Sequence, residues 1–337
     1  MHERRLMPYT FLLSAALVLM AGAACGGAAV ETKTITMYSG RGHELVKPII
    51  EQFTSLTGIR VEVRWGGTAE LAATILEEGN NSPADIFYAQ DPGALGALED
   101  RLARLPNEIL ETAGAQFRSS DGRWVGISGR ARTVVYNKES VSEDELPDSI
   151  WGFVEPQWMG RIGWAPTNGS FLVMVTGMRY LWGEDRTRLW LDGIMANDPQ
   201  VYPKNSPIVQ AVGAGEVDVG FVNHYYLLRA LQENPQFPAS NFHTRNSDPG
   251  ALMMVSGVGM LASSENQDAT LKLVAFLLSE VGQQYFASQT FEYPVVRGVT
   301  TDPTLVPLSE IDAPAIKLSE LADLEGTLDL LRDAGVL

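Results

Sequence analysis

The chain has 337 residues, of which 25 are Lys or Arg and 41 are Asp or Glu, so its formal net charge is −16. This length, with 45% hydrophobic residues, suits about two globular domains and argues against disorder or a repeat array. Phosphate backbones and anionic membrane surfaces repel so acidic a chain, and it has no basic patch, so we expect no nucleic-acid partner. The single Cys excludes an intramolecular disulfide and any metal site made of several Cys.

The first 25 residues have the pattern of an export signal. Two Arg near the start precede a short apolar run, residues 11–20 (FLLSAALVLM), and small residues then lead to Cys25. No apolar run reaches the roughly 18 residues that a membrane helix needs, so we expect no transmembrane segment in the exported protein. Cys25 followed by two Gly resembles a bacterial lipoprotein site, although Gly22 stands where Leu is usual. Either Cys25 carries a lipid or it is incidental to an ordinary signal, and the expected location is the periplasm or the outer face of the cytoplasmic membrane.

The exported part opens with alternating strand and helix patterns. Residues 34–38 alternate as a strand does, a helix with apolar residues three and four apart ends at Gly58, and residues 61–65 form a second strand. A second helix, closed by Gly79, leads to a third short strand at 85–88. This β-α-β-α-β order predicts a mainly parallel sheet whose ligands bind beyond the carboxyl ends of the strands. The loops that follow these three strands are therefore the expected positions for a site.

Longer apolar runs organise the remainder of the chain. Residues 124–137 predict a long strand, 208–212 a helix and 217–222 a further strand. Residues 251–261 predict another long strand, and one helix follows at about 270–288. Two long strands that bracket a middle unit predict two lobes between which the chain crosses more than once.

Eight segments spread over the chain carry a combined resemblance to a known family. They are YSGRGHELV (38–46), SPADIFYAQD (82–91), GISGRARTVVYN (126–137), GRIGWAPTNGSF (160–171), YPKNSPIVQAV (202–212), GEVDVGFVNHYYL (215–227), DPGALMMVSGVGML (248–261) and FEYPV (291–295). In this order they resemble the periplasmic ferric-iron-binding proteins of bacterial ABC importers, which are extracellular solute-binding proteins. The resemblance covers essentially all of residues 34–337.

The resemblance implies a fold and a function. The fold is α/β with two lobes, each a mixed, mainly parallel sheet flanked by helices, and with a ligand cleft at the hinge. The N-terminal lobe would contain residues 34–128 plus about 253–288, and the C-terminal lobe residues 130–250 plus about 290–337. The function would be that of a monomeric substrate-binding component that closes on ferric iron and delivers it to a membrane permease. No catalysis is expected.

Two adjacent tyrosines, Tyr225 and Tyr226, match the family's tyrosine ligands. They come just after the strand predicted at 217–222, where side chains at an irregular turn or helix start can converge. Ferric ion prefers hard oxygen donors, and coordination to a metal lowers the effective pKa of a phenol. Without this context, two half-buried aromatic residues packing a helix would be the simpler interpretation.

The positions of the family's His and Glu ligands differ in this chain. The His position is Gly42 and His43 comes one residue later, so His43 is either a ligand or an exposed residue of a loop or first helical turn. The Glu position is Gln90, which has no anionic oxygen. Either Asp91 replaces the Glu, or this lobe contributes only water and hydrogen bonds; the other interpretation of Asp91 is the N-cap of a helix that starts at Pro92.

An iron with too few protein ligands needs an anion beside it, and the resemblance implies carbonate or phosphate. Arg130 and Arg132 lie two apart in an extended run, so they face the same side, where a guanidinium can hold such an anion through two hydrogen bonds. Residues 168–170 resemble the family's anion-binding loop. Gly169 lets backbone N–H groups approach the anion, and Ser170 can cap the following helix while it donates to the anion. The alternative for the two arginines is pairing with carboxylates, and the alternative for residues 168–170 is an ordinary polar turn. Asn223 also suits a helix N-cap. The candidate anion-binding residues are Arg130, Arg132, Asn168, Gly169, Ser170, Asn205 and Asn223.

Two other classes of function compete with this one. An enzyme is disfavoured because the chain has no HExxH, GxxxxGK[ST] or GxSxG motif and no Cys beyond residue 25. The alternative is the same fold binding a different small solute, such as a polyamine, a sugar or a thiamine-like cation. Phenol oxygens that converge near Arg130 would favour a metal, whereas tyrosine rings that form a stacking slot would favour an organic solute.

Overall fold

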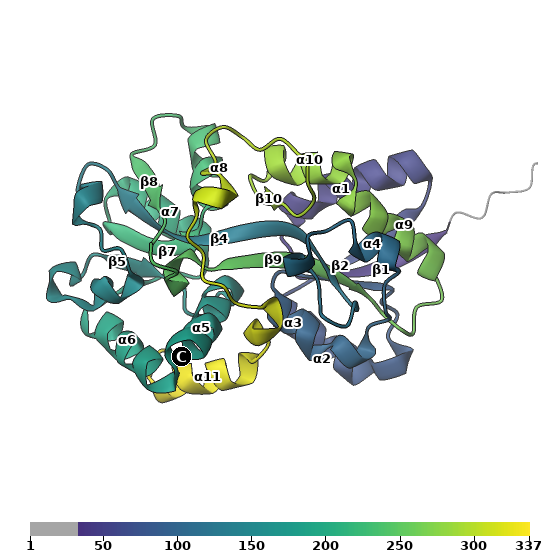
Figure 1. Cartoon of the computed structure of the whole chain (residues 1–337), viewed down its shortest axis with the longest axis horizontal. Coiled ribbons are helices and arrows are strands. Elements are labelled where there is room, and N and C mark those ends of the chain that lie inside the picture. Colours follow the sequence, from purple (N-terminus) through teal and green to yellow (C-terminus); the bar gives the residue numbers. More distant parts are fainter. Residues whose placement is uncertain (1–32) are drawn as a thin grey trace, which may run out of the picture. The chain divides into compact units, whose positions relative to one another are not determined.

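A ten-stranded mixed sheet runs through residues 33–337, which are the residues that the computed structural model describes. Its strands follow the order β2-β1-β3-β9-β4-β7-β5-β6, and β8 and β10 pair with β4 (Figure 1). The strands are β1 (Thr34–Ser39), β2 (Arg60–Trp65), β3 (Ile86–Ala89), β4 (Val125–Asn137), β5 (Ile162–Trp164), β6 (Gln200–Val201), β7 (Val219–Asn223), β8 (Ala239–Phe242), β9 (Met253–Met260) and β10 (Tyr293–Pro294). The predicted export signal and Cys25 lie outside the described residues.

Helices cover both faces of this sheet. They are α1 (His43–Thr57), α2 (Thr68–Glu78), α3 (Pro92–Ala97), α4 (Asn107–Leu110), α5 (Gly169–Trp182), α6 (Glu184–Ala196), α7 (Asn205–Ala214), α8 (Tyr225–Glu233), α9 (Gln267–Leu278), α10 (Glu280–Gln289) and α11 (Leu324–Asp333). Within residues 33–337, none of the helices combines the length and the apolar character that a membrane crossing requires.

The opening of the chain folds as its local pattern predicts. Strand β1 pairs in parallel with both β2 and β3, and α1 buries the apolar residues that recur at helical spacing. Gly58 ends α1 at a φ of 72°, and Gly79 ends α2 at a φ of 58°. This left-handed backbone favours glycine, which has no Cβ to clash with the following carbonyl.

Two long antiparallel strands, β4 and β9, connect two hydrophobic cores. They pair from Val125 opposite Val258 to Ala131 opposite Met253. The first half of β4 packs in a core shared with β1, β3 and α9, and its second half packs in a core shared with β7, α5 and α6. This arrangement confirms the predicted two-lobed fold. The residue boundaries proposed for the lobes stay a prediction.

The prediction of a single helix at about 270–288 is wrong, because the structure has two helices there, α9 and α10. Ser279 stands between them with an extended backbone, and its hydroxyl accepts a hydrogen bond from the Gly282 N–H. The hydroxyl thus caps the start of α10. The apolar periodicity continues across this break, so periodicity alone could not reveal it.

Candidate functional site

A cavity of ≈ 570 Å³ is lined by loops of both lobes. On the N-terminal side its walls come from the loops that follow β1, β2 and β3, including Arg41 and Gln90. On the other side they come from the start of α5 and from Tyr226 on α8. The three loops are those at the carboxyl ends of the opening parallel strands, where the alternating pattern predicts a site.

Tyr225 and Tyr226 begin helix α8, directly after β7. Their rings stack with centroids 4.2 Å apart and planes inclined by 29°. Tyr225 is fully buried, and its hydroxyl has no hydrogen-bond partner among the described residues. Burial and the neighbouring Tyr225 raise the pKa of Tyr226, whereas the charges of Arg41 and Arg130 act in the opposite direction.

Arg130 and Arg132 of β4 are fully buried beside this tyrosine pair. None of the three guanidinium nitrogens of Arg130 has a hydrogen-bond partner in residues 33–337. Arg132 Nη1 donates to Asn223 Oδ1 over 3.1 Å, and burial together with the positive charge of Arg130 lowers the pKa of Arg132 to about 9. Burying guanidinium groups without full pairing is costly, because each loses its hydration without a compensating partner.

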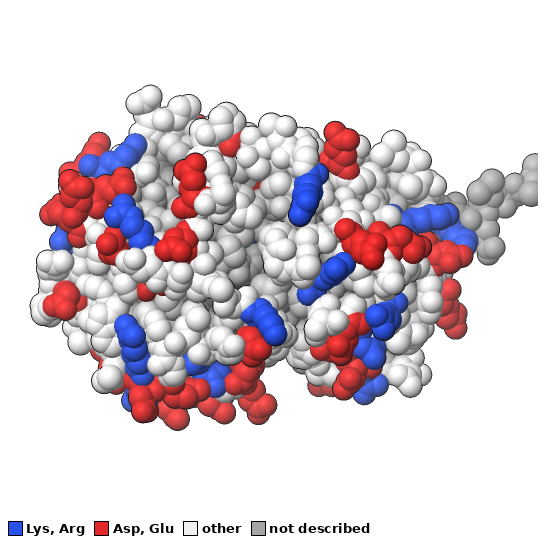
Figure 2. Space-filling view, in the orientation of Figure 1, with Lys and Arg blue, Asp and Glu red and all other residues white. Residues whose placement is uncertain are grey.

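The positive site contrasts with the acidic surface of the protein. In Figure 2, Asp and Glu side chains gather around α6 and α11. Glu325, Asp329 and Asp333 of α11 are exposed. The excess negative charge of the sequence therefore lies partly on an outer surface, while the interior beside the tyrosines carries arginines. Composition alone gives no sign of this separation.

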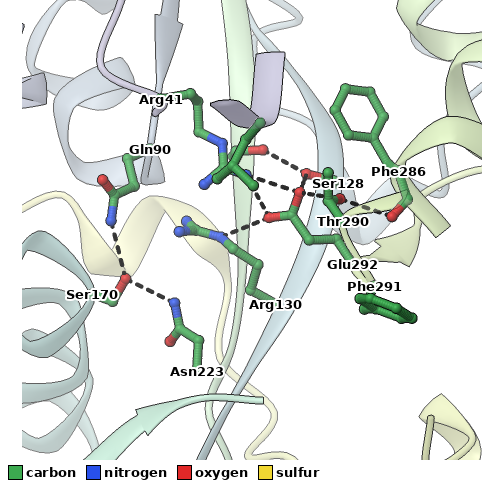
Figure 3. Close-up of polar contacts among 12 residues, drawn as sticks. Arg41, Gln90, Ser128, Arg130, Ser170, Asn223, Phe286, Thr290, Phe291 and Glu292 are labelled. Atoms are coloured by element: carbon green, nitrogen blue, oxygen red, sulfur yellow. Dashed lines mark hydrogen bonds and ion pairs between the residues drawn. The ribbon is translucent and has the colours of Figure 1, made fainter. Parts of the chain in front are cut away.

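Ser170 connects the two sides of the cavity. Its Oγ accepts hydrogen bonds from Asn223 Nδ2 at 3.0 Å and from Gln90 Nε2 at 3.3 Å (Figure 3). Asn168, rather than Ser170, caps helix α5, because its Oδ1 accepts a hydrogen bond from the Ser170 N–H at 3.0 Å. The Ser170 hydroxyl is thus available to the site, and the prediction that it caps the helix is wrong.

Two of the predicted anion-binding residues, Asn223 and Asn205, are asparagines at or next to the start of a helix. Asn223 is not the N-cap of α8, since His224 occupies that position and the Asn223 side chain binds Arg132 and Ser170 instead. Asn205 begins α7 and is fully buried, and neither atom of its amide has a partner among the described residues.

The two doubtful metal ligands, Asp91 and His43, both lie at the start of a helix. Asp91 is the N-cap of α3, where its Oδ1 accepts a hydrogen bond from the Ala94 N–H at 3.2 Å. Burial raises the pKa of this carboxyl. His43 is exposed at the first position of α1, with its ring edge-on to Trp65 at 5.0 Å. These are the N-cap and first-turn positions that the sequence offered as alternatives to metal binding.

An ion pair between Arg41 and Glu292 completes the site, and the sequence analysis missed it. Arg41 Nη2 lies 2.6 and 2.8 Å from the two carboxylate oxygens of Glu292, and both side chains are buried. Glu292 also accepts hydrogen bonds from Ser128 Oγ and Thr290 Oγ1 and lies 4.0 Å from Arg130 Nε (Figure 3). Both residues stand in segments that carry the family resemblance. A lone Glu between Phe291 and Tyr293 was the available signal that a charge is buried there.

The family follows from comparison with known proteins. Residues 81–317 match the model of a bacterial extracellular solute-binding protein, and the chain belongs to this family. It is 37% identical to the major ferric iron-binding protein of Neisseria meningitidis serogroup A over 90% of this chain and 93% of that protein. It is 33% identical to the Fe(3+)-binding periplasmic protein of Serratia marcescens, over 97% and 96% of the two chains.

A solved structure agrees with these relatives. Iron-bound HitA from Pseudomonas aeruginosa resembles this chain with a TM-score of 0.87 and 36% identity, over 90% of this chain and 99% of HitA. Proteins of this family bind solutes outside the cytoplasm for transport. The predicted resemblance is therefore confirmed, as is the prediction that the chain is not an enzyme.

Proposed function

We propose that this chain is the substrate-binding component of an ABC importer and that it binds ferric iron for delivery to a membrane permease. Tyr225 and Tyr226 would provide tyrosinate oxygens to the iron. Arg130, Arg132 and Ser170, with their neighbours, would hold carbonate or phosphate as a synergistic anion. Export, and a lipid anchor at Cys25, remain predictions from the sequence.

One observation carries this proposal: unpaired anion-binding and metal-binding groups are buried together. The Tyr225 hydroxyl and three nitrogens of Arg130 have no hydrogen-bond partner within residues 33–337, although about 90% or more of buried polar groups in proteins are hydrogen-bonded. A metal would take the deprotonated Tyr225 oxygen, and an anion on that metal would accept hydrogen bonds from Arg130. A single ferric–anion complex would thus bind both the Tyr225 oxygen and the Arg130 guanidinium. Relatives named for ferric-iron binding support the same conclusion.

The rest of the cavity suits an anion better than a second set of metal ligands. The start of the 14-residue helix α5 directs backbone N–H groups to this region, beside the Ser170 hydroxyl. Gln90 offers an amide where the resemblance places a glutamate, and Asp91 is engaged as a helix cap. The protein would therefore leave several positions on the iron to oxygens of the anion or water.

The tyrosine geometry also bears on the alternative, a different small solute in the same cleft. Rings 4.2 Å apart are in direct contact, so no third ring fits between them. Polyamine and thiamine-like cations would meet the positive charges of Arg130 and Arg132. Both features favour the metal–anion interpretation.

The test is a titration of the purified protein with Fe³⁺ in bicarbonate or phosphate, followed by visible absorption. We expect a coloured one-to-one complex that Tyr225→Phe loses and that acid dissociates, because protonation removes the tyrosinate ligands. Tyr180→Phe changes an exposed tyrosine and should retain the colour. Iron binding without colour, or equal colour in the Tyr225→Phe variant, would contradict tyrosinate ligation. The absence of any binding would reject iron as the ligand.

A further inference from the structure

Arg41 lines the N-terminal side of the cavity, and its ion pair with the buried Glu292 has no role in the function proposed above. Arg41 comes from the loop after β1, and Glu292 comes from the segment just before β10. Glu292 is fully buried, and Arg41 is almost fully buried. Replacing a buried ion pair by apolar residues is often neutral or stabilising, so fold stability alone is a weak explanation for it.

Arg41 is directed at the cavity. It lines the cavity together with Gln90 and Tyr226, and its contact with Glu292 uses only Nη2. Its Nε has no partner among the described residues. Figure 3 shows the guanidinium ends of Arg41 and Arg130 pointing to the same side, toward the region between Gln90 and Ser170.

The charges of this cluster define the ligand that it can accept. The arginines at 41, 130 and 132 carry three positive charges, and the carboxyls of Glu292 and Asp91 carry at most two negative charges, so the buried cluster has a net charge of at least plus one. Two tyrosinates and Fe³⁺ add one further positive charge. A buried excess of at least two positive charges is unfavourable, and an accompanying anion with two or more negative charges would reduce it.

We propose that Arg41, held in position by Glu292, is the group with which the N-terminal lobe binds the anion on the iron. A guanidinium cannot coordinate a metal, but it binds carboxylate and phosphate oxygens through parallel hydrogen bonds. The cargo would then be a ferric ion that carries a multiply charged oxyanion, a phosphate or a polycarboxylate. This inference rests on the proposed function for the iron. It adds that the N-terminal lobe, through Arg41, contributes to binding the anion that Arg130, Arg132 and Ser170 also hold.

The experiment compares wild-type protein, Arg41→Gln and Arg41→Lys in titrations with Fe³⁺ in bicarbonate, in phosphate and in citrate. We expect Arg41→Gln to keep the tyrosinate colour but to lose affinity by about tenfold or more with the multiply charged anions, as expected for one charged hydrogen bond. Arg41→Lys should recover part of the loss, because it restores the charge without the planar geometry. Arg60→Gln, at an exposed position of the same lobe, is the matched control. Comparing the phosphate and citrate series shows which oxyanion the site prefers.

Removal of Arg41 leaves Glu292 without its partner and could destabilise the fold, so the double variant Arg41→Gln/Glu292→Gln provides a neutral pair of similar shape. Glu292→Gln alone should weaken binding of the multiply charged anions in the wild-type background. Its effect should be smaller in the Arg41→Gln background, because Glu292 then acts on the anion site only through Arg130, whose Nε lies 4.0 Å from its carboxylate.

A second arm omits iron and measures thermal unfolding of the same proteins in increasing citrate or phosphate. The anions should raise the melting temperature of the wild type more than that of the double variant. If wild type binds no iron but still shows this difference, the proposed metal is wrong and the role of Arg41 in anion binding stands. Equal affinities and equal stabilisation in wild type and in both Arg41→Gln proteins would overturn the inference.

Discussion

The phenol rings of Tyr225 and Tyr226 stack on each other with their centroids 4.2 Å apart, although the two residues are adjacent in the chain. Successive side chains of a regular helix leave its axis about 100° apart, so neighbours do not normally meet in this way. The pair stands at the first turn of α8, directly after β7, where the chain changes from strand to helix. This junction allows both rings to approach the buried arginines of β4.

The burial of the Tyr225 hydroxyl without a partner predicts a conflict between stability and function. Tyr225→Phe removes this unpaired group, so urea denaturation of the iron-free protein should show unchanged or increased stability, by up to about 1 kcal/mol. Tyr293→Phe is the matched comparison, because the Tyr293 hydroxyl donates to the Val306 carbonyl at 2.6 Å. That variant should lose about 1 kcal/mol. Equal losses in the two variants would show that Tyr225 is paired in solution.

Gln90 provides a test by gain of function. The resemblance places a glutamate ligand at this position, and the structure places Gln90 on the cavity wall within hydrogen-bond distance of Ser170. Gln90→Glu should raise Fe³⁺ affinity by at least about tenfold, because it adds an anionic oxygen that the hard cation prefers. It should also make binding less dependent on bicarbonate or phosphate, as titrations at several anion concentrations would reveal.

Gln236→Glu adds the same charge at an exposed position and should leave both properties unchanged. If Gln90→Glu behaves like this control, its carboxylate does not reach the metal. The lobe that carries it would then contribute hydrogen bonds alone.

Much of the fold could be predicted because local chemistry determines it. The helix ends at Gly58 and Gly79 need a left-handed backbone, and the alternation of strands and helices determines the parallel opening of the sheet. The break between α9 and α10 was missed because the Ser279 cap interrupts the backbone while the apolar period continues. Local periodicity reports which side of a helix is buried, and it does not report where one helix ends and the next begins.

The candidate site could be predicted only in part. The loops after the opening strands, the tyrosine pair and the β4 arginines were all visible in the sequence. The Arg41–Glu292 pair joins residues 251 positions apart, and nothing local links them. The N-cap role offered for Asn223 as an alternative to anion binding is wrong, because capping is a local preference and the partners of Asn223, Arg132 and Ser170, come from other elements. The roles of these residues depend on partners that are distant in the sequence, and local patterns carry no information about such partners.

The buried His224 and the half-buried His243 predict a pH-dependent loss of stability in the iron-free protein. Burial lowers the pKa of His224 to about 3 and that of His243 to about 4, whereas both titrate near 6.5 when unfolded. The unfolded state therefore binds more protons below about pH 6.5, and the stabilising contribution is complete above that pH and lost as pH falls toward the folded values. The free energy of unfolding should fall by up to about 1.4 kcal/mol per pH unit for each histidine.

Urea titrations between pH 6.5 and 5 measure this slope above the range in which most carboxylates titrate. His243→Gln should reduce the slope by about one proton. His43→Gln, at an exposed position, should leave it unchanged. A wild-type slope that His243→Gln does not alter would show that His243 is as accessible to protons in the folded protein as in the unfolded chain.

Glu292 predicts a stability effect that separates buried from exposed ion pairs. Glu292→Ala removes the partner of the buried Arg41 and a neighbouring charge from Arg130, so it should cost about 3–5 kcal/mol in urea denaturation. Asp148→Ala breaks the exposed ion pair with Arg245 and should cost less than about 1 kcal/mol. Because a bound anion can replace the lost carboxylate near Arg41, phosphate or citrate should restore part of the stability of Glu292→Ala and none of that of Asp148→Ala. Equal costs for the two variants, with no rescue by either anion, would mean that Arg41 relaxes into solvent once Glu292 is gone.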